Sequence, residues 1–203
     1  MGKGGLFDLE KHFAFYGAYH SNPINVLIHM VFVWPIAFSL SVLLYFTPSI
    51  FAPLPQIHFS LLGSDFHLIF NLGFCLTLIY CLFYISFDIK AGSLAALMIL
   101  GCWIGGSAVA IKLGYSLAWK VVLASQIFCW GAQFIGHGVF EKRAPALLDN
   151  LSQAFLMAPF FVLLEALHMC CGYEPYPGFY SSVQVKVNAE KQHLEAKKIK
   201  KVT

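Results

Sequence analysis

YHSNPINVLIH (residues 19–29) has the composition of a helix that starts at the edge of a membrane, with a histidine on either side of the start. Asn22 suits the N-cap, because its side-chain oxygen can accept a hydrogen bond from a free backbone N–H. Pro23 suits the first helical position, where no N–H is needed. The residues that follow are nearly all apolar, so His29 is predicted about two turns inside the membrane and His20 just outside it. Ionisable groups at such depth are rare and mostly functional, so we interpret His29 as either a hydrogen-bonded neutral histidine or a metal ligand.

The composition excludes an ordinary soluble domain. Of the 203 residues, 59% are hydrophobic and 11% are charged, whereas soluble domains are typically about 25% charged. The net charge of +3 comes largely from the C-terminal tail, and no interleaved basic and aromatic patch indicates a nucleic-acid partner. The six cysteines lie within or at the end of apolar runs and include no CxxC pair, so we expect neither a disulfide framework nor a cysteine zinc site.

Five apolar runs of about the length needed to span a bilayer follow a short amphipathic segment, 6–19. The runs are 24–46, 66–87, 91–111, 117–140 and 150–169. Glycines in the third run, Gly101, Gly105 and Gly106, would allow close helix contact. The fold predicted is an all-α polytopic membrane protein, a bundle of four to five transmembrane helices with an N-terminal interfacial amphipathic helix. We expect a membrane helical domain with the active site at 1–172. A cytosolic polar tail, either a frayed helix or disordered, is expected at 173–203.

The number of membrane crossings that precede each histidine decides on which face of the membrane it lies, and therefore which histidines can be neighbours. If the first four runs all cross, His20, His29 and His137 lie at one face of the membrane, whereas His58 and His67 lie at the other. Lysine and arginine favour the first face as cytosolic. The chain ends in KKVT, a dilysine ending of the kind that coat machinery reads from the cytosol. We therefore favour a fifth run that is broken at Pro159 and re-enters, since five full crossings would put the tail on the wrong side.

A second constellation lies at the end of the fourth run. His137 and Glu141 are one helical turn apart, so both should project from one face, as a metal-binding pair or as a histidine oriented by a carboxylate. Gly136 and Gly138 would let another helix or a ligand approach closely. A re-entrant fifth run would add two further candidates to this site, Glu165 and His168. Three histidines suit Zn, Cu, Fe or Ni, and the absence of HxxxH and HxxHH clusters argues against a di-iron site.

Together, YHSNPINVLIH and GHGVFEKRAPALLDNLSQAFLMAPFFVLLE (residues 136–165) resemble the yeast-type 2-hydroxy fatty acid dioxygenase family. The resemblance covers most of 10–170 in layout. It implies a multi-pass protein of the endoplasmic reticulum membrane that acts in phytosphingosine degradation. The implied reaction is α-oxidation, in which a 2-hydroxy fatty acid reacts with O2 and becomes a fatty acid one carbon shorter, and the implied cofactor is Fe²⁺.

The resemblance also suggests roles for individual residues. His20, His29 and His137 match the family's histidine positions, and we expect them to bind the metal. With Glu141 they form the predicted catalytic set. Lys142 and Arg143 are candidates for drawing in the substrate head group, although both also suit simple cytosolic anchors.

Two other functions remain open from the sequence. The first is a haem protein with His29 and His137 as axial ligands. The second is a non-enzymatic membrane scaffold or lipid-binding protein whose histidines are satisfied by hydrogen bonds.

Overall fold

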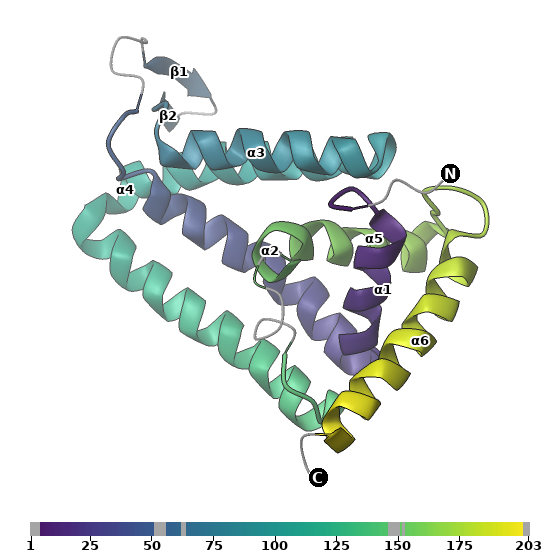
Figure 1. The fold of residues 1–203 in the computed structure, drawn as a ribbon. Helices are drawn as coiled ribbons and strands as arrows, with labels where there is room; N and C mark the ends of the chain where they lie inside the picture. Colours follow the sequence, from purple (N-terminus) through teal and green to yellow (C-terminus); the bar gives the residue numbers. More distant parts are fainter. Residues whose placement is uncertain (1–4, 51–55, 62–63, 146–150, 152, 201–203) are drawn as a thin grey trace. The chain divides into compact units, whose positions relative to one another are not determined.

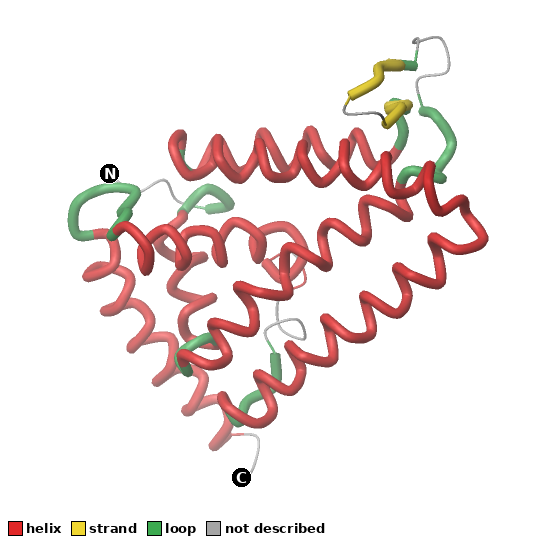
Figure 2. Tube along the Cα trace, turned by 180° about the vertical axis from the view of Figure 1, so that it is seen from behind, coloured by secondary structure: helices red, strands yellow, loops and turns green. Residues whose placement is uncertain are grey.

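The computed structural model describes residues 5–50, 56–61, 64–145, 151 and 153–200. Helices dominate these residues, and one two-stranded hairpin is the exception (Figures 1 and 2). The chain groups into two units, one made of residues up to Met30 and from Gln133 onward, the other of Val31–Ala132. The elements in order are α1 Leu9–Tyr19, α2 Pro23–Leu44, β1 Ile57–Leu61, β2 Ser64–Leu68, α3 Leu72–Phe87, α4 Ile89–Ile135, η1 Gly136–Glu141, η3 Gln153–Met157, α5 Ala158–Cys171 and α6 Phe179–Lys200.

Helix α1 forms the centre of the first unit. Asp8 caps its N-terminus, because the carboxylate accepts a hydrogen bond from the Lys11 N–H at 3.0 Å. Phe13 is buried in the middle of the helix and contacts Phe161 of α5 and Phe179 of α6, with ring centroids 5.4 and 5.6 Å apart. The apolar side of this helix therefore packs against protein. Its predicted location at the membrane interface stays a prediction.

The C-terminal tail forms helix α6. From the sequence, this tail was expected to be either a frayed helix or disordered. It lies beside α1. Val187 packs so closely on Gly17 that a side chain at Gly17 would displace it. Lys186 forms an ion pair with Glu10. Gly172 ends α5 with a positive φ of 65°, and the expected domain boundary at 172/173 stays a prediction. The dilysine ending extends past Lys200 into residues outside the described range.

In the second unit, the third and fourth apolar runs both belong to α4. The helical conformation is interrupted between the two runs, as the sequence predicted. The break is at Gly114, whose φ of 65° and ψ of 161° are not helical. Before it, Gly105 and Gly106 pack against Phe38 and Ser41 of α2. The Ser41 hydroxyl donates a hydrogen bond to the Cys102 carbonyl oxygen at 2.7 Å. The predicted close helix contact is thus present at two of the three glycines. At Gly101, no atom of the described residues lies within 4 Å of the position that a Cβ would take, apart from the helix's own backbone.

The hairpin corrects two predictions. The fold is not entirely helical, because β1 and β2 pair antiparallel with His58 opposite His67. The second apolar run was predicted to start near 66, but α3 begins at Leu72, where the Asn71 side chain accepts a hydrogen bond from the Phe74 N–H at 3.2 Å. The strand sequence IHFSL alternates apolar and polar residues, which is the period of a strand.

Among the described residues, three helical stretches are long and apolar enough to cross a membrane: Pro23–Leu44, Ile89–Glu141 and Gln153–Cys171. The second contains two of the predicted runs, and α3, with 16 residues, is apolar but shorter. Pro159 does not interrupt α5. It lies in the first turn of that helix, directly after the π-helical η3, and the two form one continuous helical stretch, so the predicted break of the fifth run at Pro159 is wrong. The count of four to five crossings stays a prediction.

Candidate metal centre

His20 lies immediately after α1, and its ring is fixed by the residue one turn earlier. Its Nδ1 donates a hydrogen bond to the carbonyl oxygen of Tyr16 at 2.8 Å. The two rings also stack, with centroids 4.1 Å apart and planes 18° apart. Because a carbonyl oxygen only accepts, Nδ1 carries the hydrogen and Nε2 keeps its lone pair. That Nε2 is buried and has no hydrogen-bond partner among the described residues.

His29 repeats this arrangement two turns into α2. Its Nδ1 donates to the Asn25 carbonyl oxygen at 2.9 Å, so Nε2 is again the atom with a lone pair. The residue is 5% exposed. A ligating histidine commonly donates its other ring N–H to a backbone carbonyl or a carboxylate, which fixes the tautomer and the direction of the lone pair.

His137 is the second residue of η1 and is 3% exposed. This segment is π-helical, and single π-helical turns within α-helices are rare and frequent at functional sites. Its Nδ1 is buried and has no hydrogen-bond partner in the part of the chain that the structure describes. The backbone carbonyl oxygen of His137 is used, since it accepts from the N–H groups of Lys142 and Arg143 as the helix ends.

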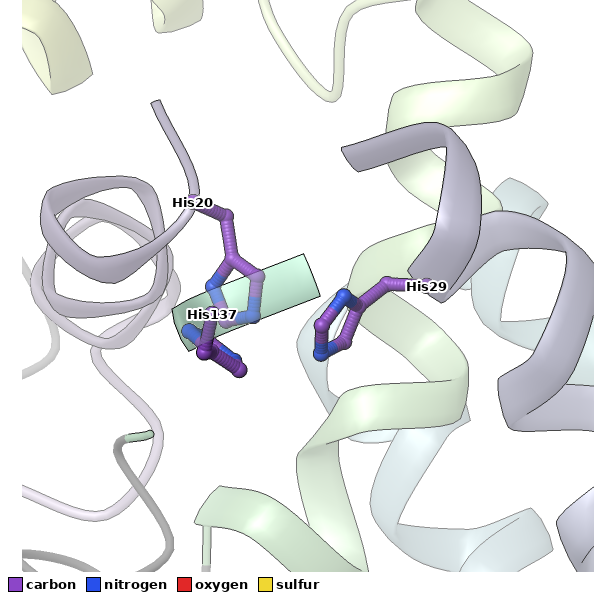
Figure 3. A group of neighbouring side chains, drawn as sticks. All are labelled: His20, His29 and His137. Atoms are coloured by element: carbon purple, nitrogen blue, oxygen red, sulfur yellow. The ribbon is translucent and has the colours of Figure 1, made fainter. Parts of the chain in front are cut away.

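The three imidazoles converge, as the count of spans predicted. Figure 3 shows the rings of His20, His29 and His137 turned toward one another. Their centroids lie 4.4 to 4.8 Å apart, with planes 68–79° apart. One nitrogen from each ring can be chosen so that all three lie within 4.8 Å of one another. All three belong to the first unit, so the cluster is internal to one compact part of the chain.

The three imidazoles are a donor set that could hold a transition-metal ion. Burial, and after it the neighbouring His29 and His137, hold the pKa of His20 well below its usual value of 6.5, so this ring is neutral at neutral pH. Neutral imidazole nitrogen is a ligand for Zn, Cu, Fe or Ni. Metal–nitrogen distances are about 2.0–2.1 Å, so binding would draw the three nitrogens modestly closer together.

The comparisons with known proteins agree with this geometry. A family model described as "2-hydroxy-palmitic acid dioxygenase Mpo1-like" matches residues 6–170. The chain belongs to this Mpo1-like family. Among curated proteins, the 2-hydroxy-palmitic acid dioxygenase MPO1 of Saccharomyces cerevisiae is 38% identical over 167 residues, which cover 82% of this chain and 83% of the yeast protein. No solved structure matches the chain.

In this Mpo1-like chain, Glu141 binds the start of α2. Its Oε1 accepts hydrogen bonds from the N–H groups of Ser21 and Asn22, both at 2.6 Å, and from the Asn25 side chain at 3.3 Å. The segment that carries both His137 and Glu141 is π-helical rather than α-helical. Glu141 lies outside the group of three ligand atoms. Its predicted catalytic role stays a prediction, and its contacts are those of a positioning residue.

Gly136 lets α2 and η1 come into contact. A Cβ at this position would overlap the Asn25 side-chain oxygen. Asn25 is fully buried, and its backbone carbonyl is the one that holds His29. The close approach predicted from Gly136 is therefore present. Gly138, the second glycine in that prediction, has no atom within 4 Å of where its Cβ would be, in the part of the chain that the structure describes.

Lys142 and Arg143, the predicted head-group pair, differ from each other. Lys142 is exposed and takes a left-handed conformation with φ of 51°. Arg143 donates from Nη1 to the Ala18 carbonyl oxygen at 2.7 Å, and its guanidinium lies 5.7 Å from the centre of the Tyr19 ring. Arg143 thus ties η1 to the C-terminal end of α1, where a cation is favourable. Substrate attraction by either residue stays a prediction.

The two further candidates, Glu165 and His168, lie on α5 and do not join the three imidazoles. His168 stacks on Tyr180 with centroids 3.6 Å apart, and its Nδ1 donates to the Tyr173 carbonyl oxygen at 3.3 Å. Glu165 is half-buried and lies close enough to Tyr16 to affect it electrostatically.

The sequence interpretation missed the roles of Tyr16 and Asn25. Neither residue was predicted to be part of the site. Each precedes a clustered histidine by four residues, and its backbone carbonyl oxygen accepts from that histidine's Nδ1. The sequence carried no signal for these bonds, because every residue has a backbone carbonyl.

Proposed function

We propose that this chain is an iron(II)-dependent dioxygenase that converts 2-hydroxy fatty acids into fatty acids one carbon shorter, in phytosphingosine degradation. The observation that carries the proposal is the buried cluster of His20, His29 and His137 in a chain of the Mpo1-like family. The name of the yeast relative gives the substrate class and the use of O2.

The residues present fit iron. Two of the three rings have Nδ1 committed to a backbone carbonyl, and the buried Nε2 of His20 lacks a partner among the described residues, which is the pattern of an oriented ligand set. Zinc would suit the same nitrogens but has no redox chemistry. When bound, iron(II) supplies the redox chemistry with O2 that protein side chains do not provide. His20, His29 and His137 would hold the ion, and a set of only three protein ligands would leave room beside it for the substrate and O2.

The protein's own contribution is to orient and to exclude water. Carbonyl oxygens of Tyr16 and Asn25 hold two imidazoles in fixed directions, so the ligands need little rearrangement. The near-complete burial of His29 and His137 keeps the reacting atoms away from bulk water.

A haem is the second candidate, and the geometry disfavours it. Axial histidines must lie on opposite sides of a flat macrocycle. The His20 ring is within 4.8 Å of both the other two, so it would occupy the plane of that macrocycle. The absence of a Soret band in the purified protein would agree with this argument.

The test uses purified full-length protein in detergent, loaded with Fe²⁺ under anaerobic conditions. On addition of O2, we expect 2-hydroxypalmitic acid to yield the fatty acid with one carbon fewer, and no product with Zn²⁺ or after chelation. His137→Ala should lose bound iron and at least about 100-fold of the activity, since three ligands act as one unit. His58→Ala, in the hairpin, is the matched control and should retain both. Activity that survives in His137→Ala would contradict the proposed centre, and a non-enzymatic scaffold would bind no iron at all.

We further propose that the protein lies in the endoplasmic reticulum membrane with both ends in the cytosol. Lys3, Lys11, Lys90, Lys142 and Arg143 support this orientation, against Lys112 and Lys120 on the other side. In this proposal the membrane domain is 1–172, and the segment 173–203 presents the dilysine ending to coat machinery. Replacing the two lysines of KKVT by serine should release the protein from the endoplasmic reticulum, which fluorescence imaging of tagged chains would detect. Unchanged localisation would contradict the retrieval role.

A further inference from the structure

Tyr16 carries a buried polar group that the fold leaves without a hydrogen bond. The residue is 4% exposed, and its hydroxyl has no hydrogen-bond partner among the described residues. Such groups are costly and uncommon in native proteins, and each calls for an explanation. The nearby Tyr180 follows the usual rule, because its hydroxyl donates to the Leu164 carbonyl oxygen at 3.1 Å.

The unpaired hydroxyl belongs to the surroundings of the histidine cluster. The Tyr16 ring lies flat on the His20 ring, and the Tyr16 carbonyl holds the same imidazole at Nδ1. Tyr16 therefore contacts His20 through both its backbone and its side chain.

The groups around Tyr16 favour a neutral partner over an anion. Phe13 and Phe161 pack on the ring, with centroids 5.6 and 5.4 Å away. Glu165 and Glu141 are close enough to act on the hydroxyl electrostatically. Two carboxylates oppose a third negative charge at the same place, whereas a hydroxyl group can both accept from and donate to the phenol.

We propose that Tyr16 hydrogen-bonds the 2-hydroxyl group of the fatty acid substrate and thereby selects 2-hydroxy acids over unsubstituted fatty acids. This inference rests on the proposed function. It adds a specificity-determining residue to the three ligands, on a helix that the ligand analysis of the sequence did not use.

Selection of this kind follows from the cost of an unpaired polar group. A 2-hydroxy acid satisfies the phenol, but an unsubstituted acid leaves it buried without a partner. Sites built to hydrogen-bond a substrate hydroxyl discriminate strongly against analogues that lack it, for this reason.

The test measures equilibrium binding, so that it does not depend on turnover. Fe²⁺-loaded full-length protein in detergent, kept free of O2, is titrated with 2-hydroxypalmitic acid and with palmitic acid. Wild-type protein should prefer the 2-hydroxy acid. In Tyr16→Phe, this preference should fall by about five- to tenfold, the value of one hydrogen bond, mainly through weaker binding of the 2-hydroxy acid. Tyr180→Phe, which removes a hydroxyl that the protein already pairs, is the control and should keep the wild-type preference.

The results distinguish a failure of the inference about Tyr16 from a failure of the proposed function. Tyr16→Phe should keep its iron and unfold at the wild-type temperature or above it, because it removes an unpaired polar atom. An unchanged preference in Tyr16→Phe, or an equal loss of affinity for both acids, would overturn the role of Tyr16 alone. If wild-type protein binds neither acid, the proposed function fails and the inference fails with it.

Discussion

Glu141 accepts a hydrogen bond from the backbone N–H of Ser21 at 2.6 Å, although 120 positions separate the two residues along the chain. Together with the bond from Asn22, this contact joins η1 to the start of α2. His20 lies just before that start, and His29 lies two turns after it. The distances between the imidazoles thus depend on a carboxylate that does not belong to the ligand group.

Replacing Glu141 separates the contribution of its hydrogen bonds from that of its charge. Glu141→Ala removes an acceptor for three donors and should cost about 0.5–2 kcal/mol of stability, as loss of a helix cap does. We also expect weaker iron binding, because the start of α2 is released. Glu141→Gln keeps an acceptor oxygen and should lie close to wild type in both thermal unfolding and iron content. If Gln proves as damaging as Ala, the negative charge, and with it direct ligation, becomes the better explanation.

The close contact at Gly136 can be tested by substitution, with Gly138 in the same segment as the control. Gly136→Ala places a methyl group against the Asn25 side chain, so α2 and η1 must separate; overpacking of this kind costs about 1–3 kcal/mol. Gly138→Ala, two residues further along the same helical turn, meets no described atom and should leave stability almost unchanged. Thermal unfolding and iron content measured in parallel would check both. Equal effects of the two substitutions would show that the close approach at Gly136 is unimportant.

The burial of Phe179 predicts that the C-terminal helix is part of the folded unit. Phe179 is fully buried against Phe13, and its truncation to Ala should cost about 3–5 kcal/mol. Val185 on the same helix is 71% exposed, and Val185→Ala should change stability little. Limited proteolysis should also cut α6 faster in Phe179→Ala than in wild type. A tail that is cut equally fast in both proteins would contradict the packing of α6 on α1.

The pKa of His20 predicts how the metal-free protein responds to acid. Burial holds this pKa well below 6.5 in the folded chain, so below pH 6.5 the unfolded state binds more protons than the folded state. Stability is therefore retained above about pH 6.5 and falls as the pH drops below it, by at most about 1.4 kcal/mol per pH unit for one such group. Denaturant unfolding of chelator-treated protein between pH 7 and 5 would measure the slope. His20→Asn should flatten it, and an unchanged slope in that variant would contradict the assignment.

The sequence predicted the convergence of His20, His29 and His137 because the argument needed only the number of crossings before each residue. It also predicted a break between the third and fourth apolar runs, which Gly114 provides. Both predictions depend only on which long segments are apolar, and this can be read directly from the sequence.

The finer geometry was beyond reach because it depends on partners distant in the chain. Glu141 accepts hydrogen bonds from Ser21 and Asn22, which precede it by about 120 residues, and no local pattern in the sequence predicts these partners. The sequence contains a weaker pattern that predicts the packing of α6, and this pattern was overlooked. Phe179, Val183 and Val187 recur every four residues and are all buried, but the charged residues between them hid this stripe in the overall composition.

The grouping of both chain ends into one unit has a consequence for biosynthesis. His20 and His29 leave the ribosome first, and the whole second unit must be translated before His137 and the α2-capping Glu141 follow. A nascent chain therefore cannot assemble the cluster while most of its helices are being inserted. The complete set of three imidazoles can therefore form only after all of Val31–Ala132 has been synthesised.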